Sequence, residues 1–239
     1  MSLVHVLLWV ILPYAAATCF VVGHWWRYRT DQFAWTSRST QLLDRRILGW
    51  ASPMFHYGAL AAIGGHVIGL CIPPSVTAAI GISEGFYRWF AGIAGGIAAL
   101  VTLIGFLGLL FRRASSDRVR VTTSRMDLLT YFFLTFLICL GTYMTFANTL
   151  LGGAHPFNYR PTIGAWWRSL FYLHPNVAAA VRAPLAYQLH AIVGWGFWAV
   201  FPFGRLVHAW SIPLQYLGRP YIIYRRRYQS ARRRYQPLR

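Results

Sequence analysis

Apolar side chains fill five long stretches of the chain, and polar side chains gather between them. The apolar stretches cover residues 4–25, 47–72, 86–111, 128–151 and 185–210. Each is longer than the ~18 residues that indicate a membrane span. Because backbone polar groups inside lipid must be paired within their own segment, each stretch is predicted to be a helix. The pattern therefore predicts an all-α membrane protein with five transmembrane helices, organised as a single membrane domain over residues 1–239.

The composition agrees with this prediction. Hydrophobic residues make up 56% of the 239 residues and charged residues only 12%, which is about half the charged share of a soluble domain. Two consecutive prolines, Pro73 and Pro74, are predicted to end the second span, because they cannot continue a helix. Trp166 and Trp167 beside Arg168 are typical of the boundary between water and lipid.

The basic residues are distributed unevenly along the chain. The net charge is +18, and all 23 basic residues are Arg. Five of them lie in residues 26–46, five in 112–127 and eight in the tail, residues 211–239. Positive charge stays on the cytoplasmic side during insertion, so the N-terminus is predicted outside and the C-terminus in the cytoplasm. Clusters between spans favour a membrane-surface or partner-docking role over nucleic-acid binding.

Four histidines lie inside predicted spans, namely His56 and His66 in the second and His190 and His208 in the fifth. An ionisable side chain in the membrane is costly and by default indicates function. Taken singly, each histidine is equally consistent with a polar residue bonded across a helix contact. Two on each of two helices favour a shared ligand, because imidazoles from facing helices are axial ligands of haem iron in helical bundles.

The direction of the chain decides how these histidines pair. Antiparallel spans place His56 with His208 near the cytoplasmic side and His66 with His190 near the outer side. Ideal helices do not match this pairing, because the first two histidines lie about 15 Å apart along the helix axis and the other two about 27 Å. Pro202 lies between the fifth-span histidines and is predicted to kink or break that helix. The interpretation is two six-coordinate haems stacked across the membrane.

Residues near the histidines fit this interpretation, with an alternative in each case. No CxxCH motif occurs, so the haems are expected to be b-type. Arg112, Arg113 and Arg205 are predicted to pair with haem propionates on the inner side, although arginines that extend toward water give the same pattern. Glycines near His66 and His190 would allow a flat macrocycle to approach and are equally typical of helix contacts. These glycines are Gly64, Gly65, Gly69, Gly194 and Gly196.

Acidic residues occur only in loops and at span ends. They are Asp31, Asp44, Glu84, Asp117 and Asp127. Proton pumps and ion-coupled transporters usually carry buried carboxylates as relays, so the pattern favours an electron-transfer protein. A transporter or channel and a cofactor-free membrane anchor are the alternatives from other classes, and both would be colourless.

The chain closely resembles the gamma subunit of membrane-bound respiratory nitrate reductase, a dihaem cytochrome b. The resemblance is carried by three segments, SRSTQLLDRRILGWASPMFHYGALAAIGGHVIGL, FRRASSDRVRVTTSRMDLL and LHAIVGWGFWAVFPFGRLVHAWSIPLQYLGRPY. It extends from the ILPY motif of the first span into the tail. It implies a five-helix subunit with two b haems. The implied ligands are His56, His208, His66 and His190.

The resemblance also implies an activity and partners. Quinol would be oxidised near the outer haem, with His66 and Gly65 at the quinol pocket. Electrons would then pass to an iron–sulfur beta subunit and to a molybdenum-containing alpha subunit that reduces nitrate at the cytoplasmic membrane. A lysine found at this pocket in some members has no counterpart, because the chain contains no Lys; Glu84 or Arg88 stands in that region. Related subunits serve sulfite-reduction-linked, heterodisulfide-reductase-like and nitrite-oxidising complexes, which leaves the terminal substrate open.

Overall fold

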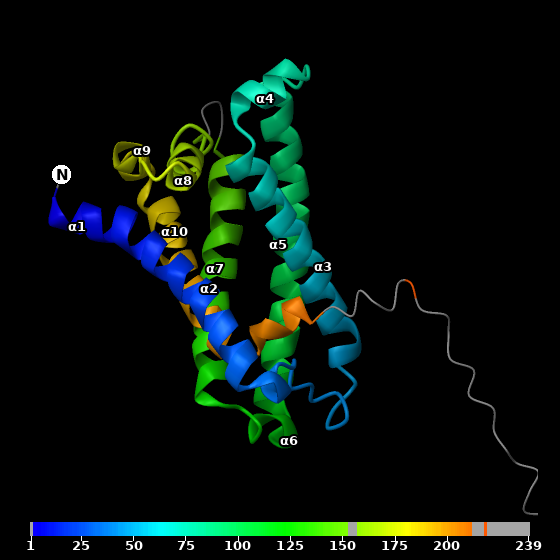
Figure 1. The fold of residues 1–239 in the computed structure, drawn as a ribbon. Helices are drawn as coiled ribbons and strands as arrows, with labels where there is room; N and C mark the ends of the chain where they lie inside the picture. Colours follow the sequence, from blue (N-terminus) through cyan, green and yellow to red (C-terminus); the bar gives the residue numbers. More distant parts are fainter. Residues whose placement is uncertain (1, 153–156, 212–217, 219–239) are drawn as a thin grey trace, which may run out of the picture.

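All regular secondary structure in the described part of the chain is helical (Figure 1). The structure is a computed structural model that describes residues 2–152, 157–211 and 218. Apart from Ser211 and Gly218, the predicted basic tail lies outside the described residues.

Four helices within the described residues are long and apolar enough to cross a membrane. They cover Leu3–Thr30, Leu48–Cys71, Glu84–Ser115 and Arg125–Ala147. Their segments are α1 (Leu3–Val6), the π-helical η1 (Leu7–Ile11), α2 (Leu12–Thr30), α3 (Leu48–His66), the π-helical η3 (Val67–Cys71), α5 (Glu84–Ser115), α7 (Arg125–Tyr143) and the π-helical η4 (Met144–Leu150). These helices coincide with the first four predicted spans to within a few residues at most ends. The chain has the architecture of a multi-pass membrane protein.

The fifth predicted span, residues 185–210, is not one continuous helix. Helix α10 (Leu185–Val200) ends two residues before Pro202. Two 3-10 segments follow, η5 (Phe201–Phe203) and η6 (Arg205–Trp210), and Gly204 between them is extended. The predicted break at Pro202 is confirmed, because proline removes a backbone donor and its ring clashes with the preceding turn. The 16 residues of α10 rise about 24 Å, less than the ~30 Å thickness of a hydrocarbon core.

The remaining helices are short and connect the long ones. They are the 3-10 segment η2 (Gln32–Ala34), α4 (Pro74–Ala79), α6 (Asp117–Arg120), α8 (Ile163–Phe171) and α9 (Val177–Val181). Two of the long helices, α5 and α7, begin at sequence signals for a helix N-terminus. The Ser83 side chain accepts a hydrogen bond from the Phe86 backbone at the start of α5. At the start of α7, Ser124 and Asp127 form a reciprocal capping box.

Two groups of helices make up the bundle (Figure 1). Helix α3 packs along α5, whereas α10 packs on α2 and α7. Glycine allows the close approach of α3 and α5, because a Cβ at Gly58 would lie 2.6 Å from the Thr102 backbone nitrogen and one at Gly105 would collide with the Phe55 backbone. The second and fifth predicted spans thus belong to different groups, and their histidines face each other across the bundle.

An aromatic cluster packs α8 against the first helix at the end of the bundle that the sequence predicts to be outer, here called the outer end. Trp166 of α8 is 1% exposed, and its indole N–H donates to the Trp9 carbonyl over 3.0 Å. The rings of Trp9 and Trp166 meet edge to face at 5.1 Å. The polar edge of Trp166 therefore meets protein rather than water, because α8 folds back against the first helix and buries this face, and its position at the membrane boundary stays a prediction. Trp167 is partly buried and stacks on Trp195 at 5.3 Å.

Candidate functional site

The four histidines of the second and fifth predicted spans meet as two pairs. The ring centroids of His56 and His208 lie 6.0 Å apart with an angle of 71° between their planes. Those of His66 and His190 also lie 6.0 Å apart, with planes only 11° from parallel. The structure therefore brings together the same pairs that the direction of the chain predicts.

The break after α10 explains how both pairs form. His190 lies within α10, whereas His208 lies on η6, beyond Pro202 and the extended Gly204. The two histidines of α3 sit on one continuous helix. The length mismatch calculated for straight helices does not apply, because His190 and His208 do not lie on one straight helix.

Backbone carbonyls orient three of the four imidazoles. The Nδ1 atoms of His56 and His66 each lie 2.7 Å from the carbonyl four residues earlier, those of Ser52 and Ala62. The Nδ1 atom of His208 lies 2.7 Å from the Arg205 carbonyl. A carbonyl can only accept, so each Nδ1 carries the proton and donates. The lone pair of a neutral ring is then on Nε2, which is the tautomer of a metal ligand.

His190 differs from the other three. Its Nδ1 atom is buried and has no hydrogen-bond partner among the described residues. A Cβ added to Gly141 of α7 would lie 3.3 Å from its Cε1 atom. Buried polar atoms are rarely left unpaired in folded proteins, and no carbonyl of the described residues sets the tautomer of the His190 ring as it does for the other three imidazoles.

The spacing of the rings fits a metal ion held between two imidazoles. A ligating nitrogen lies about 2 Å from a bound metal and about 1.1 Å from its own ring centroid, so two ligands on one axis place their centroids about 6 Å apart. Both pairs have this separation. No third His, Cys, Asp or Glu joins either pair within the part of the chain that the structure describes. A haem fits such a pair, because its porphyrin supplies the remaining ligands.

The glycines near the histidines divide into two kinds. A Cβ at Gly65, beside His66, would meet nothing within 4 Å, and the same holds for Gly64 and Gly194. Gly69 instead lies against the Tyr159 hydroxyl, and Gly196 lies against the Phe133 ring of α7. These last two serve contacts within the protein, as the helix-packing alternative expects. The other three contact no neighbouring element at the position of a Cβ, and nothing in the described part of the protein requires glycine there.

The three arginines predicted to face propionates each have a partner in the protein. Arg112 donates to the Thr40 and Asp44 carbonyls over 2.8 and 2.6 Å. Arg113 donates to the Thr123 hydroxyl over 2.7 Å. The guanidinium of Arg205 forms two 2.7 Å bonds with the Asp127 carboxylate. They hold the inner loops and the segment that carries His208, and a role toward propionates stays a prediction.

A polar network that sequence reasoning missed lies at the outer end of α5. Arg160 is fully buried and pairs with Glu84 over 2.6 Å, and its guanidinium sits 3.9 Å from the centre of the Tyr87 ring. The hydroxyls of Tyr87 and Tyr159 are 3.2 Å apart. Burial, with the Tyr87 hydrogen bond as a second cause, raises the pKa of Tyr159, so this hydroxyl stays protonated at neutral pH.

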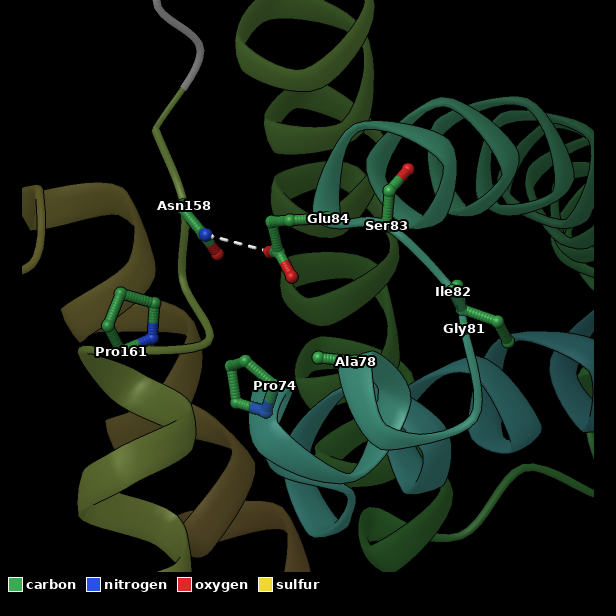
Figure 2. A pocket seen from close by; sticks show the side chains of 8 residues that line it. All are labelled: Pro74, Ala78, Gly81, Ile82, Ser83, Glu84, Asn158 and Pro161. Atoms are coloured by element: carbon green, nitrogen blue, oxygen red, sulfur yellow. Dashed lines mark hydrogen bonds between the residues drawn. The ribbon is translucent and has the colours of Figure 1, made fainter.

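The network is joined to the end of the second span and to a pocket. Arg160 donates to the Ile72 carbonyl over 3.2 Å, and Arg168 donates to the Leu70 carbonyl over 2.9 Å. Beside the network is a pocket of about 450 Å³ in which Asn158 donates to Glu84 over 2.9 Å (Figure 2). Its lining is Pro74, Ala78, Gly81, Ile82, Ser83, Glu84, Asn158 and Pro161.

A family model for the nitrate reductase gamma subunit matches residues 5–227 of the chain. The chain belongs to the nitrate reductase gamma subunit family. It is 40% identical over 221 residues to the nitrate reductase gamma chain of Bacillus subtilis, covering 92% of this chain and 98% of that protein. It is 32% identical over 230 residues to the respiratory nitrate reductase 1 gamma chain of Escherichia coli, covering 95% of this chain and 100% of that protein.

A further relative is longer than this gamma-family chain. The nitrate reductase-like protein NarX of Mycobacterium tuberculosis is 46% identical over 221 residues, which is 92% of this chain and 34% of that protein. The chain therefore spans about a third of the length of this relative.

The outer network left only a weak signal in the sequence of this family member. Glu84 and Arg160 are isolated charges in loops or at helix ends, and nothing in their spacing links them. The same applies to Asp127 and Arg205, which are far apart in the chain. A single acidic residue at N3 of a capping box, as in SRMD, predicts only a helix start.

Proposed function

We propose that this gamma-family chain is the quinol-oxidising dihaem cytochrome b subunit of a membrane-bound nitrate reductase complex. One observation carries the proposal: two imidazole pairs, each with centroids 6.0 Å apart, lie at two positions along the bundle. The assigned ligands are His56 with His208 for an inner haem b and His66 with His190 for an outer one.

The chain's own contribution is to present neutral imidazoles with their Nε2 lone pairs free. Carbonyls at Ser52, Ala62 and Arg205 accept the Nδ1 protons of His56, His66 and His208 and hold these three rings in this tautomer. Such a bond to the distal nitrogen also raises the basicity of the ligating one. When bound, haem b supplies one-electron transfer at a potential suited to quinol oxidation.

The outer end of the bundle is the proposed place of quinol oxidation. A Cβ at Gly65 would meet nothing within 4 Å, so the described part of the protein does not fill the space at this glycine, which the family resemblance assigns to the quinol pocket. The chain contains no Lys, and in the corresponding region Glu84 is bonded to Arg160 and Asn158. A carboxylate at this end can accept a proton that quinol loses and pass it to water, so that quinol protons are released outside.

The inner side of the chain is the proposed docking side for the partner subunits. Three arginine-rich segments are expected on the cytoplasmic side of the inner membrane, namely residues 26–46, residues 112–127 and the tail. An iron–sulfur beta subunit would receive the electrons there, and a molybdenum-containing alpha subunit would reduce nitrate on another chain. Positive patches favour encounter with partner surfaces of opposite charge.

The reduced-minus-oxidised visible spectrum of the purified protein tests the proposal. We expect two b haems per chain, quantified as the pyridine haemochrome. A transporter or a cofactor-free anchor would give no such spectrum, so a colourless, folded protein would refute the proposal. Addition of a quinol analogue should reduce the haems without any other electron donor.

A further inference from the structure

The segment that carries His208 is held in place by other helices rather than by α10. Helix α10 ends at Val200, and only 3-10 turns and the extended Gly204 connect it to His208. Short 3-10 turns have poorer hydrogen-bond geometry than an α-helix. The position of this imidazole therefore depends on what the η5–η6 segment, residues 201–210, contacts.

One contact comes from α7. The Asp127 carboxylate is 3% exposed and receives two 2.7 Å hydrogen bonds from the Arg205 guanidinium. Two parallel bonds between charged groups fix orientation as well as distance. Asp127 is itself held, because its Oδ2 atom accepts from the Ser124 backbone over 3.0 Å in the capping box.

A second contact comes from α2. The guanidinium of Arg27 is buried and donates to the carbonyls of Pro202 and Gly204, both over 2.7 Å. It also donates to the Ala34 carbonyl over 2.9 Å. One cation thus satisfies the carbonyls that the break in the fifth span leaves without helical partners. The Thr130 hydroxyl of α7 packs closely against Gly204.

Arg205 links these contacts to the imidazole. Its side chain is held by Asp127, and its backbone carbonyl accepts the Nδ1–H of His208 over 2.7 Å. The structure thus contains a continuous connection from Ser124 through Asp127 and Arg205 to the ring of His208. The other three histidines of the two pairs, His56, His66 and His190, lie within regular α-helices. None of the three is joined to an ion pair by a hydrogen bond among the described residues.

We propose that Asp127 and Arg27 are positioning residues for the inner imidazole pair. They act on His208 through the η5–η6 segment, with Asp127 setting the place and tautomer of the ring by way of Arg205. The proposal rests on the proposed function, in which His208 is an axial ligand. In this proposal Asp127 and Arg27 affect only the inner haem. The outer pair of histidines does not depend on either residue.

Asp127→Asn in the full chain tests this assignment. The amide keeps an oxygen for the Ser124 backbone but loses the charge that pairs with Arg205. We expect the inner haem to bind about tenfold more weakly, as is usual when a residue supporting a metal ligand is changed. We also expect a shifted midpoint potential and a shifted low-spin electron paramagnetic resonance signal for that haem. The outer haem should keep its signal and occupancy, which shows in the same sample that the protein is folded.

Four further variants complete the test. His56→Tyr and His66→Tyr identify which signal belongs to which haem. Glu84→Gln breaks the Arg160–Glu84 pair at the outer end and should leave the inner signal unchanged. Arg27→Gln should reproduce the inner defect of Asp127→Asn.

The outcomes separate this proposal from the proposed function. An unchanged inner signal in both Asp127→Asn and Arg27→Gln overturns the positioning role, as does equal loss of both haems, which indicates a purely structural role. Asp127→Glu keeps the charge and is expected to retain both haems with only a small change in the inner signal; full loss of both there also overturns the proposal. A wild-type protein without haem removes the proposed function together with this inference.

Discussion

The imidazole rings of His66 and His190 face each other with planes 11° apart, at a centroid separation of 6.0 Å. The inner rings have the same separation and cross at 71°. The mutual orientation of two axial ligands influences how the iron d orbitals split. The two pairs therefore present chemically similar and geometrically different environments to a bound group.

This difference predicts two distinguishable haems. We expect two resolved low-spin signals in electron paramagnetic resonance of the oxidised protein and two separate steps in a redox titration. Signals that superimpose and titrate in a single step would contradict distinct environments.

Replacement of one outer ligand should remove one haem. In His66→Tyr the inner pair is intact, so haem content should fall by about half, and quinol should no longer reduce the remaining haem. The pyridine haemochrome and quinol-driven reduction measure the two effects. His174→Tyr is the matched control, because His174 is exposed in a loop of the outer segment and should keep both haems. Loss of the inner signal in His66→Tyr would show that the assigned pairing is wrong.

Close packing of α3 on α5 should make Gly58 intolerant of a side chain. A Cβ there would lie 2.6 Å from the Thr102 backbone nitrogen, and backbone cannot move aside as a flexible side chain can. We expect Gly58→Ala to destabilise the protein by about 1–3 kcal/mol, the usual cost of overpacking. Thermal unfolding in detergent measures this.

The control for that experiment lies on the same helix. A Cβ at Gly49 would meet nothing within 4 Å. Gly49→Ala should therefore be neutral or stabilising by up to about 1 kcal/mol, because alanine is the better helix former. Equal behaviour of the two variants would argue against a close α3–α5 contact.

The Glu84–Arg160 pair should contribute to stability at the outer end. Arg160 is fully buried, whereas the Glu84 side chain is 36% exposed. Glu84→Gln leaves a buried cation without its counter-charge, and we expect a loss of about 1–3 kcal/mol in the free energy of unfolding. The exposed pair of Asp117 and Arg120 provides the comparison, because Asp117→Asn should change stability by less than about 1 kcal/mol. Similar effects would mean that burial of Arg160 does not matter.

Tyr159 should make the protein sensitive to alkali. Burial and the Tyr87 hydroxyl raise its pKa in the folded state above the unfolded value, which is about 10. Below about pH 10 Tyr159 is protonated in both the folded and the unfolded state, and its full contribution to the free energy of unfolding is present. Above this pH the unfolded state releases a proton that the folded state keeps, so stability falls by up to about 1.4 kcal/mol per pH unit.

The matched variant for this prediction is Tyr159→Phe. Its thermal unfolding curve, followed between about pH 8 and pH 11, should decline less steeply above pH 10 than that of the wild type. The other tyrosines are common to both proteins and cancel in the comparison. Parallel declines would show that Tyr159 ionises equally easily in both states.

Local features of the sequence were sufficient for the membrane architecture and the histidine pairs. A run of apolar residues long enough to cross lipid has only one way to satisfy its backbone, so four spans could be read directly. Because consecutive spans run in opposite directions, the sequence also predicted which histidines lie at the same depth in the bundle. The proline in VFPFGRLVH predicted the break in the fifth segment, because the missing N–H is a property of the residue itself.

Long-range contacts decided what the sequence left open. Straight-helix geometry misaligned the two pairs, and only the course of residues 201–210, held by Arg27 and Asp127, brings His208 opposite His56. Trp166 carries the composition of a membrane boundary but is buried against Trp9. Apolar length, helix breaks and chain direction are properties of neighbouring residues, so the sequence by itself determined them. The partner of a buried charge or ring depends on residues that meet only after folding, so the tertiary structure alone decided it.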